Sequence, residues 1–256
     1  MSFYSVLKTS YKTFLPKPVR KAVYRHMPKT LKAVRKAAIR KLEKSVEFDD
    51  IYDEKYYTDV LSPRWEKSFE VIAESIMKVF SPRSVVDVGC GIGLLLLAIK
   101  KRGVICRGLE YSSAGLNMCH RNGLDVARFD LSRDILPKDL RSDVVVSTEV
   151  AEHLPERCAD RFVGVLCAIA DNVVMTAAEP AHTYVGDHTH ANEQPKEYWI
   201  AKFAQKGFKY DENISTKFRT EWKQREISPW FVQHLMVFRK EHVGRSRLSQ
   251  KTRRHG

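Results

Sequence analysis

Short apolar runs alternate along residues 84–178 with segments in which apolar residues recur every three or four positions. Runs of the first kind are typical of buried strands, and the second spacing is typical of helices that cover a sheet. We expect strands over 84–88, 104–110, 125–131, 143–148 and 172–178, and helices over 93–102, 113–122 and 156–170. Alternating strands and helices predict a parallel sheet with helices on both faces.

The flanking segments continue the pattern. Residues 65–80 carry apolar side chains at helical spacing, and Ser81-Pro82 ends that helix. After the last parallel strand we expect a helix over 197–207, a strand over 208–214 and a final strand over 232–239. The central chain therefore forms one α/β domain.

The first strand ends in a glycine-rich turn. Its β-branched run stops at Gly89, Gly91 and Gly93, and a helix follows at once. Glycine has no Cβ, so a ligand can approach the backbone closely, and the N–H groups at the helix start point toward the same place. This geometry favours a nucleotide-like cofactor.

Acidic residues stand where such a cofactor needs them. Asp87 is a charge inside an apolar strand, which is costly unless it has a partner. Glu110 ends the second strand, where an acid grips ribose hydroxyls, and Phe129-Asp130-Leu131 offers an apolar face and a carboxylate for an adenine. The spacing G-x-G-x-G differs from the dinucleotide pattern G-x-G-x-x-G and disfavours a dinucleotide oxidoreductase.

These residues resemble the class I S-adenosylmethionine (SAM)-dependent methyltransferases over roughly residues 50–240. The resemblance implies a Rossmann-like doubly wound sheet, mostly parallel with a closing antiparallel strand, and SAM as the cofactor. The residues implied to bind SAM are Tyr57, Asp87, Gly89, Cys90, Gly91, Gly93, Glu110, Tyr111, Phe129, Asp130, Leu131, Thr148 and Glu149. For Tyr57, packing against the domain edge is an equal alternative.

Charge separates the ends of the chain from its centre. The net charge is +13, but residues 1–45 hold thirteen Lys and Arg against one acid, and residues 46–238 carry −5. We expect a basic amphipathic extension over 1–47, the catalytic domain over 48–240 and a basic tail over 241–256. The extension suits an anionic membrane surface, a nucleic-acid backbone or a solvated arm.

Cysteine usage and hydropathy bear on localisation. The five cysteines are odd in number and lack C-x-x-C spacing, which indicates reduced core residues in a cytoplasmic protein. The longest apolar run, Leu94 to Ile99, is too short to span a bilayer. We expect a cytoplasmic protein, with peripheral attachment at the inner membrane face through residues 1–45 as a further hypothesis.

Candidate chemistry follows the fourth strand. Glu149, Glu152 and His153 stand at i, i+3 and i+4, so a helical turn would place all three on one side. Two carboxylates and an imidazole can hold Mg²⁺ or another divalent cation, which would orient an acceptor hydroxyl and lower its pKa.

This Glu-x-x-Glu-His pattern resembles the metal site of the small-RNA 2′-O-methyltransferases and of the ubiquinone-pathway O-methyltransferases. In the RNA enzymes a downstream histidine completes the site, and this chain offers His182, His188 and His190. The implied metal ligands are Glu149, Glu152, His153 and His190. Many relatives carry the Glu-His pair without metal, which leaves His153 as a base beside Glu152, or as a structural residue.

The acceptor is indicated by the loop after the fifth strand. His188, His190 and Asn192 are candidate substrate contacts, and the pattern that includes Gln194-Pro195 resembles bacterial methyltransferases of sugar and natural-product pathways. We expect methyl transfer to a hydroxyl of a sugar, a glycan precursor or another small molecule. The alternative is a metal-dependent RNA 2′-O-methyltransferase, although the −5 domain would repel a phosphate backbone. A non-catalytic, membrane-associated binding module is the remaining class.

Overall fold

The computed structural model describes residues 51–180 and 189–241. The expected basic extension, His182, His188 and most of the basic tail lie outside these ranges. In the two described ranges, none of the helices has the length and apolar character needed to cross a membrane.

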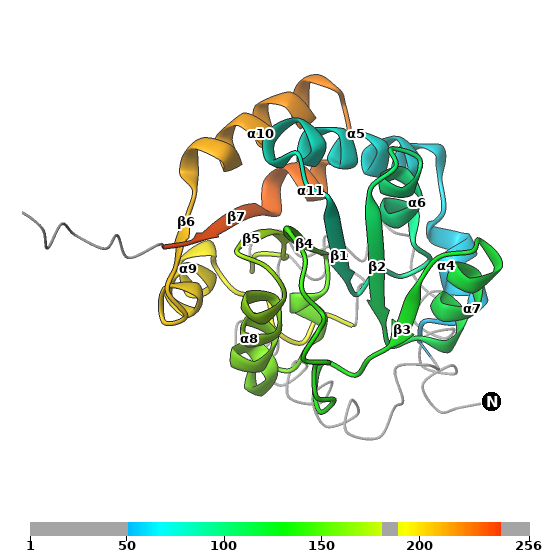
Figure 1. Ribbon diagram of the computed structural model, residues 1–256, viewed down its shortest axis with the longest axis horizontal. Coiled ribbons are helices and arrows are strands. Elements are labelled where there is room, and N and C mark those ends of the chain that lie inside the picture. Colours follow the sequence, from blue (N-terminus) through cyan, green and yellow to red (C-terminus); the bar gives the residue numbers. More distant parts are fainter. Residues whose placement is uncertain (1–50, 181–188, 242–256) are drawn as a thin grey trace, which may run out of the picture.

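A seven-stranded sheet runs through the molecule in the order β3-β2-β1-β4-β5-β7-β6 (Figure 1). The strands are β1 Ser84–Val88, β2 Ile105–Glu110, β3 Val126–Arg128, β4 Val144–Thr148, β5 Asn172–Thr176, β6 Phe208–Tyr210 and β7 Leu235–Lys240. The first five strands pair in parallel, and β7 is antiparallel to both β5 and β6. The predicted doubly wound sheet with a closing antiparallel strand is therefore confirmed.

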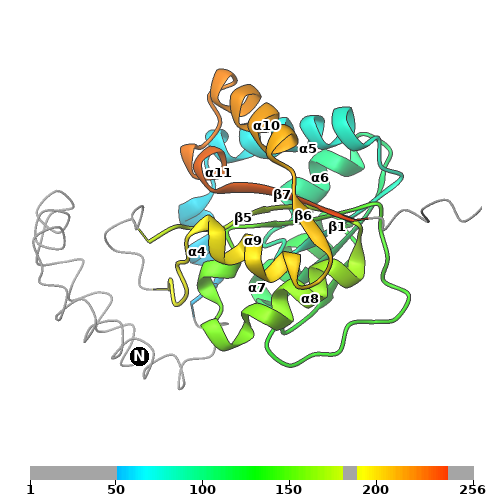
Figure 2. The same ribbon diagram turned by 90° about the vertical axis from the view of Figure 1, so that its left-hand side faces the viewer.

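Helices cover both faces of the sheet (Figure 2). One face packs against α5 Pro63–Phe80, α6 Leu94–Lys100, α10 Glu212–Gln224 and α11 Pro229–His234. The other packs against α8 Ala159–Ile169 and α9 Lys196–Ala204. Successive side chains along each strand point to opposite faces of the sheet, so each strand contributes to the apolar cores on both faces. For example, Val85 packs into the core on one face and Val86 into the core on the other.

The remaining helices lie near the sheet edge that β3 forms. The helix α7 Ser113–Arg121 contributes Leu116 and Cys119 to a small third core with β3. The helix α4 Glu54–Val60 contacts α7. Its N-terminus is capped by the Asp53 side chain, which accepts the Tyr56 N–H at 2.6 Å. The sequence pattern did not predict α4.

The C-terminal third departs from the predicted elements. The strand expected over 208–214 ends at Tyr210, because the Asp211 side chain accepts the Ile214 N–H at 3.0 Å and caps α10. The helix α11 then occupies the start of the strand expected over 232–239, so β7 begins at Leu235.

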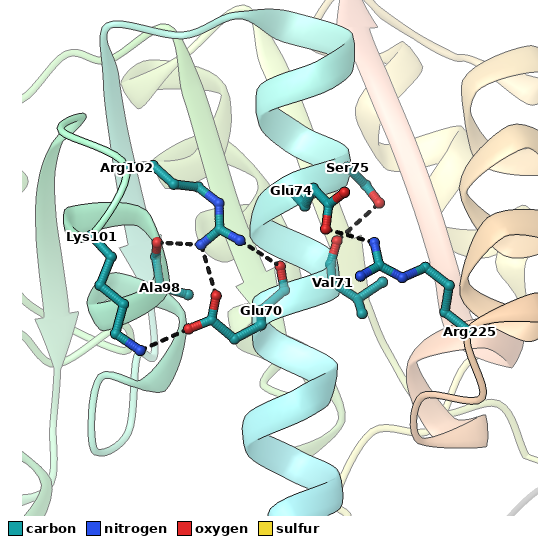
Figure 3. A network of polar contacts seen from close by, with 8 residues as sticks. All are labelled: Glu70, Val71, Glu74, Ser75, Ala98, Lys101, Arg102 and Arg225. Carbon is teal, nitrogen blue, oxygen red and sulfur yellow. Dashed lines mark hydrogen bonds and ion pairs between the residues drawn. The ribbon is translucent and has the colours of Figure 1, made fainter.

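Polar contacts attach α5 to its neighbours (Figure 3). Glu70 pairs with Lys101 and Arg102, both at 2.8 Å, and Glu74 pairs with Arg225 at 2.7 Å. Such exposed pairs each contribute about 0–1 kcal/mol. The position of α5 is determined mainly by the apolar core on this face, which buries its central residues.

Candidate active site

A cavity of about 870 Å³ opens at the carboxyl ends of β1, β2 and β4. Of the residues predicted to form the site, those that line it are Tyr57, Asp87, Gly89, Cys90, Gly91, Glu110, Tyr111, Asp130, Thr148, Glu149 and His153. Parallel strands place their carboxyl ends at one edge, so side chains far apart in sequence meet there. We call the part near the glycine turn the cofactor end, and the part beyond His153 the acceptor end.

Six other predicted residues do not line the cavity. Gly93, Phe129, Leu131, Glu152, His190 and Asn192 are set back from it, and His188 lies outside the described ranges. Phe129 and Leu131 are 5% and 8% exposed and pack into the core under α8, because apolar side chains gain more from that burial than from a wet cleft.

The glycine turn needs its glycines for two different reasons. All three have positive φ, 76° at Gly89, 56° at Gly91 and 79° at Gly93, where side chains are strained. A Cβ at Gly89 would overlap the Val150 side chain, and a Cβ at Gly93 would overlap that of Leu124. A Cβ at Gly91 would meet only Tyr57 Cε1, at 3.4 Å. The outer glycines therefore permit packing, while Gly91 keeps the cavity open.

Two acids hold the loops around the cofactor end. Glu110 accepts the Gly91 N–H and the Ser112 N–H, both at 2.7 Å, and so braces the glycine turn against the end of β2. Asp130 accepts the Ser132 N–H at 2.8 Å and pairs with Arg133 at 3.1 Å. Carboxylates that already accept hydrogen bonds are oriented before a ligand arrives.

Asp87 is the least satisfied acid at this end. It is 2% exposed, and its Oδ1 has no hydrogen-bond partner in the described part of the chain. Burial, together with the negative charge of Glu110, raises the pKa of Asp87 to about 8. An orphaned oxygen beside an open glycine turn fits a ligand that brings a positively charged N–H donor, as the amino group of SAM does.

The carboxylates after β4 do not share one helical turn, unlike the sequence prediction. The single 3₁₀ turn there covers only Ala151–His153, and Glu149 precedes it with a positive φ of 54°. The Glu149 carboxylate has His234 as a partner, with Oε1 3.4 Å from His234 Nδ1, and it stays close enough to Glu152 for its charge to act there. Glu152 is fully buried, and neither of its carboxyl oxygens has a hydrogen-bond partner within the described ranges.

The environments of these two acids shift their pKa values in opposite directions. Burial alone would raise the pKa of Glu149, but the hydrogen bond and charge of His234 outweigh it and hold that pKa below its usual value. Burial raises the pKa of Glu152 well above its usual value, and the charge of Glu149 raises it further. The surroundings of Glu149 therefore favour its anionic form, and those of Glu152 favour its protonated form.

His153 faces the cavity and is oriented from behind. Its Nδ1 lies 2.9 Å from Thr189 Oγ1, and its ring meets that of His190 edge-on at 4.8 Å between centroids. His190 Nδ1 in turn lies 2.9 Å from Glu193 Oε1. A carboxylate on one ring nitrogen fixes the tautomer of a histidine, whereas a hydroxyl, which can donate or accept, orients the ring; either leaves the other nitrogen for chemistry.

Two backbone hydrogen bonds attach this segment to the turn after β4. Ala191 and Asn192 donate their N–H groups to the Glu152 carbonyl oxygen at 2.7 and 2.9 Å. The Asn192 side chain is 1% exposed and accepts a hydrogen bond from Gln194 at 2.8 Å, so it supports the segment rather than facing the cavity. Glu152, His153 and His190 thereby offer ligand atoms within 4.8 Å of one another. This set fits a divalent cation, and Glu149 is not part of it.

The acceptor end contains residues that the sequence did not single out. An aromatic and aliphatic rim comes from α4, α5 and the residues beside them: Tyr52, Tyr56, Leu61, Trp65 and Phe69. Across from it lie Leu154, Pro155, Arg157, Tyr198 and Lys202. The tyrosine-rich stretch before α5 was the one available signal, because aromatic side chains in a polar segment need a surface to cover.

Comparisons with known proteins agree with this architecture. The family model described as "Methionine biosynthesis protein MetW" matches residues 67–185. The ubiquinone biosynthesis O-methyltransferase of Methylococcus capsulatus is 36% identical over 80 residues, 29% of this chain and 34% of that protein. The chloroplastic magnesium protoporphyrin IX methyltransferase of Arabidopsis thaliana is 31% identical over 110 residues, 40% of this chain and 34% of that one. The chain thus spans about a third of the length of the curated relatives it matches.

Among solved structures, the chain is similar to magnesium protoporphyrin IX methyltransferase from Synechocystis PCC 6803 with bound S-adenosylhomocysteine (SAH). The TM-score is 0.53 at 14% identity, over 69% of this chain and 83% of that one. With the sheet order and the glycine turn, these findings show that the chain has the fold of the class I SAM-dependent methyltransferases and is similar to them in sequence.

Proposed function

We propose that this chain is an enzyme that transfers the methyl group of SAM to a hydroxyl oxygen of a small molecule. The observation that supports this most is the single cavity shared by the glycine turn, the strand-end acids and His153. A volume of about 870 Å³ is near the upper end of small-ligand sites, which leaves room for an acceptor beside a cofactor.

The residues of the cofactor end suit SAM. Asp87 would accept hydrogen bonds from its amino group, Glu110 would bind the ribose, and Asp130 would bind the adenine. Bound SAM supplies a methyl group already activated by a positively charged sulfur. The chain's own tasks are then to align the acceptor and to remove its proton.

His153 is the base in this proposal. The acceptor oxygen forms its bond to the methyl carbon as the sulfur–methyl bond breaks, the sulfur keeps that electron pair, and the hydroxyl proton moves to His153. Thr189 holds the ring in place through Nδ1 at 2.9 Å. Glu152 is buried behind the turn, where desolvation raises the pKa of its carboxyl group.

We propose a sugar, a glycan precursor or a similar hydroxylated molecule as the acceptor. The rim of Tyr52, Tyr56, Trp65 and Phe69 supports this, because aromatic faces pack well against flat apolar surfaces, including the C–H face of a sugar ring. The curated relatives named as O-methyltransferases support an oxygen acceptor.

The second candidate is metal-assisted transfer to an RNA 2′-hydroxyl. The cluster of Glu152, His153 and His190 favours it, and Glu193 on His190 Nδ1 is the kind of outer partner that metal-ligating histidines have. In that reaction a divalent cation would lower the pKa of the acceptor hydroxyl, and Glu152 would bind it as a carboxylate.

One experiment separates the two candidates. The full chain is incubated with methyl-labelled SAM and a fractionated cell extract, with Mg²⁺ or with EDTA. Label in carbohydrate, lipid-linked or small-molecule fractions supports the first candidate, and label in RNA that EDTA abolishes supports the second. A chain that binds neither SAM nor SAH by calorimetry, and labels no fraction, would refute both.

Membrane attachment through residues 1–45 stays a prediction, since that segment lies outside the described ranges. Co-sedimentation with anionic vesicles should be lost when residues 1–45 are deleted, and unchanged co-sedimentation would argue against it.

A further inference from the structure

Glu149 and His234 meet although 85 positions separate them. Strand pairing explains the contact: Thr148 of β4 lies beside Thr176 of β5, and Thr176 lies beside Leu235 of β7. Because β7 is antiparallel, the residue before Leu235 stands at the same sheet edge as the residue after Thr148. The register of three strands therefore places His234 Nδ1 3.4 Å from Glu149 Oε1.

This pair is asymmetric with respect to the cavity. The Glu149 side chain is 19% exposed and lines the cavity, whereas the His234 side chain is 1% exposed and lies behind it. The Glu149 backbone N–H donates to Thr176 Oγ1 at 2.9 Å, which holds the residue in its left-handed conformation. A non-glycine residue kept at positive φ at a site points to a requirement for its position.

Glu149 also stands at the junction of the two ends of the cavity. Its neighbour Val150 occupies the space that a Cβ on Gly89 would need, which places this turn against the glycine turn. Four residues further on, His153 begins the acceptor end. The methyl group must travel between these two ends, so the carboxylate of Glu149 lies beside that path.

Two other acids of the cofactor end have partners on their own or neighbouring loops. Glu110 accepts two backbone N–H groups, and Asp130 pairs with Arg133. Glu149 differs because its partner is a buried imidazole that approaches from the side opposite the cavity. That partner holds the carboxylate from behind, while the Glu149 side chain itself lines the cavity.

We propose that Glu149 presents a fixed negative charge to the sulfonium end of the cofactor, and that His234 is the residue that positions it. This inference rests on the proposed function. Methyl transfer converts the sulfonium into a neutral thioether, so the attraction to Glu149 exists for SAM and disappears for SAH. The pair thereby makes the site selective for the charged methyl donor over its product and helps the product to leave.

The test compares three ligands by calorimetry on the full chain: SAM, SAH, and sinefungin, which carries an ammonium group in place of the methylsulfonium. Glu149→Gln keeps the size of the side chain and removes its charge. We expect it to weaken SAM and sinefungin about tenfold relative to SAH, equal to about 1.4 kcal/mol. The matched control is Asp130→Asn, an acid-to-amide change at the adenine end, which should weaken all three ligands by the same factor.

Two substitutions of His234 test the positioning role. Asn places an N–H donor close to where Nδ1 lies, whereas Leu removes it. We expect His234→Leu to lose the preference for SAM over SAH as Glu149→Gln does, and His234→Asn to restore most of it. If His234→Leu fails to fold, the ratio of SAM affinity to SAH affinity measured for Glu149→Gln, together with that of His234→Asn, tests the inference.

The outcomes are distinct. A ratio of SAM to SAH affinity that is unchanged in Glu149→Gln would overturn the inference and leave the proposed function standing. A wild-type chain that binds none of the three ligands would overturn the proposed function and the inference together.

Discussion

The two ends of the cavity are built in different ways. The cofactor end comes mainly from one continuous stretch, residues 84–132, in which strands end in turns that add ligand-facing residues; Tyr57, Thr148 and Glu149 join it from outside that stretch. The acceptor end is assembled from segments around 52–69, 153–160, 191 and 198–202. Local geometry therefore determines the first end, while the second depends on how distant segments pack. A fold that keeps the first end constant can change its acceptor by altering the second.

The ends also differ in charge. Three acids, Asp87, Glu110 and Asp130, line the cofactor end, whereas two acids and two bases line the acceptor end: Glu156, Arg157, Asp160 and Lys202. Lys202 is already paired with Asp160 at 2.7 Å. The contrast suits a cationic cofactor on one side and a neutral acceptor on the other. Each of the following substitutions tests one end without the other.

The largest effect is expected at His153. His153→Asn removes the base, and we expect methyl transfer to fall by about 10²–10⁴-fold, the usual contribution of general base catalysis. SAH affinity should be unchanged, because the cofactor end is intact. Single-turnover transfer to the labelled acceptor fraction measures the first quantity and calorimetry the second. A parallel loss of SAH binding would show that the two ends are not separable.

Gly89→Ala should damage the cofactor end through packing. The new Cβ overlaps Val150 at a positive φ of 76°, and we expect a loss of unfolding free energy of ~3 kcal/mol from overpacking and backbone strain together. The matched control is Gly103→Ala, at φ 74° with nothing within 4 Å, which should cost only the strain, ~1 kcal/mol. Urea unfolding measures both, and equal losses would exclude a specific role for the Val150 contact.

The raised pKa of Asp87 predicts that the free energy of unfolding depends on pH. Its pKa of about 8 in the folded protein exceeds the ordinary value of 3.8, so the folded state holds this proton more tightly than the unfolded chain does. The stability that Asp87 contributes is complete below pH 4, declines as the pH rises to about 8, and is constant above that.

Asp87→Asn cannot lose a proton in this range. Its stability relative to wild type should therefore increase from pH 5 to pH 9, by about 4 kcal/mol. Urea unfolding at pH 5, 7 and 9 without ligand measures this. Parallel pH profiles for the two chains would contradict the assignment of a neutral, buried Asp87.

The smallest effect is expected at Thr189. Thr189→Val removes the hydroxyl beside His153 Nδ1 at nearly constant volume, and we expect about fivefold slower transfer, the value of one neutral hydrogen bond of about 1 kcal/mol. The pH dependence of the rate should shift as the ring loses its partner, and Thr189→Ser should restore it. A slower rate with an unchanged pH profile would indicate a merely structural role.

The cofactor end could be predicted from the sequence because its signals are local. The G-x-G-x-G turn, Glu110 and Asp130 each directly follow a strand whose apolar run is visible in the chain. The parallel sheet places those strand ends side by side without further information. Phe129 and Leu131 show where this prediction fails. They flank Asp130, which lines the cavity, but their own side chains face the core.

The acceptor end could be predicted only in part. The i, i+3, i+4 spacing suggested one cluster of Glu149, Glu152 and His153, but the turn begins at Ala151, and Glu149 precedes it and pairs with His234. No spacing pattern connects His234 with Glu149 or Thr189 with His153, because those contacts arise from strand register and from a distant segment.

By itself, the sequence determined the order of strands and helices, the glycine turn and the acids at the strand ends, because these follow from residue periodicity and backbone geometry within a few positions. The tertiary structure alone decided that the pKa values of two nearby glutamates shift in opposite directions. Burial raises the pKa of Glu152, and a histidine 85 positions away holds that of Glu149 below its usual value. Desolvation and pairing depend on three-dimensional neighbours, and a linear pattern does not contain them.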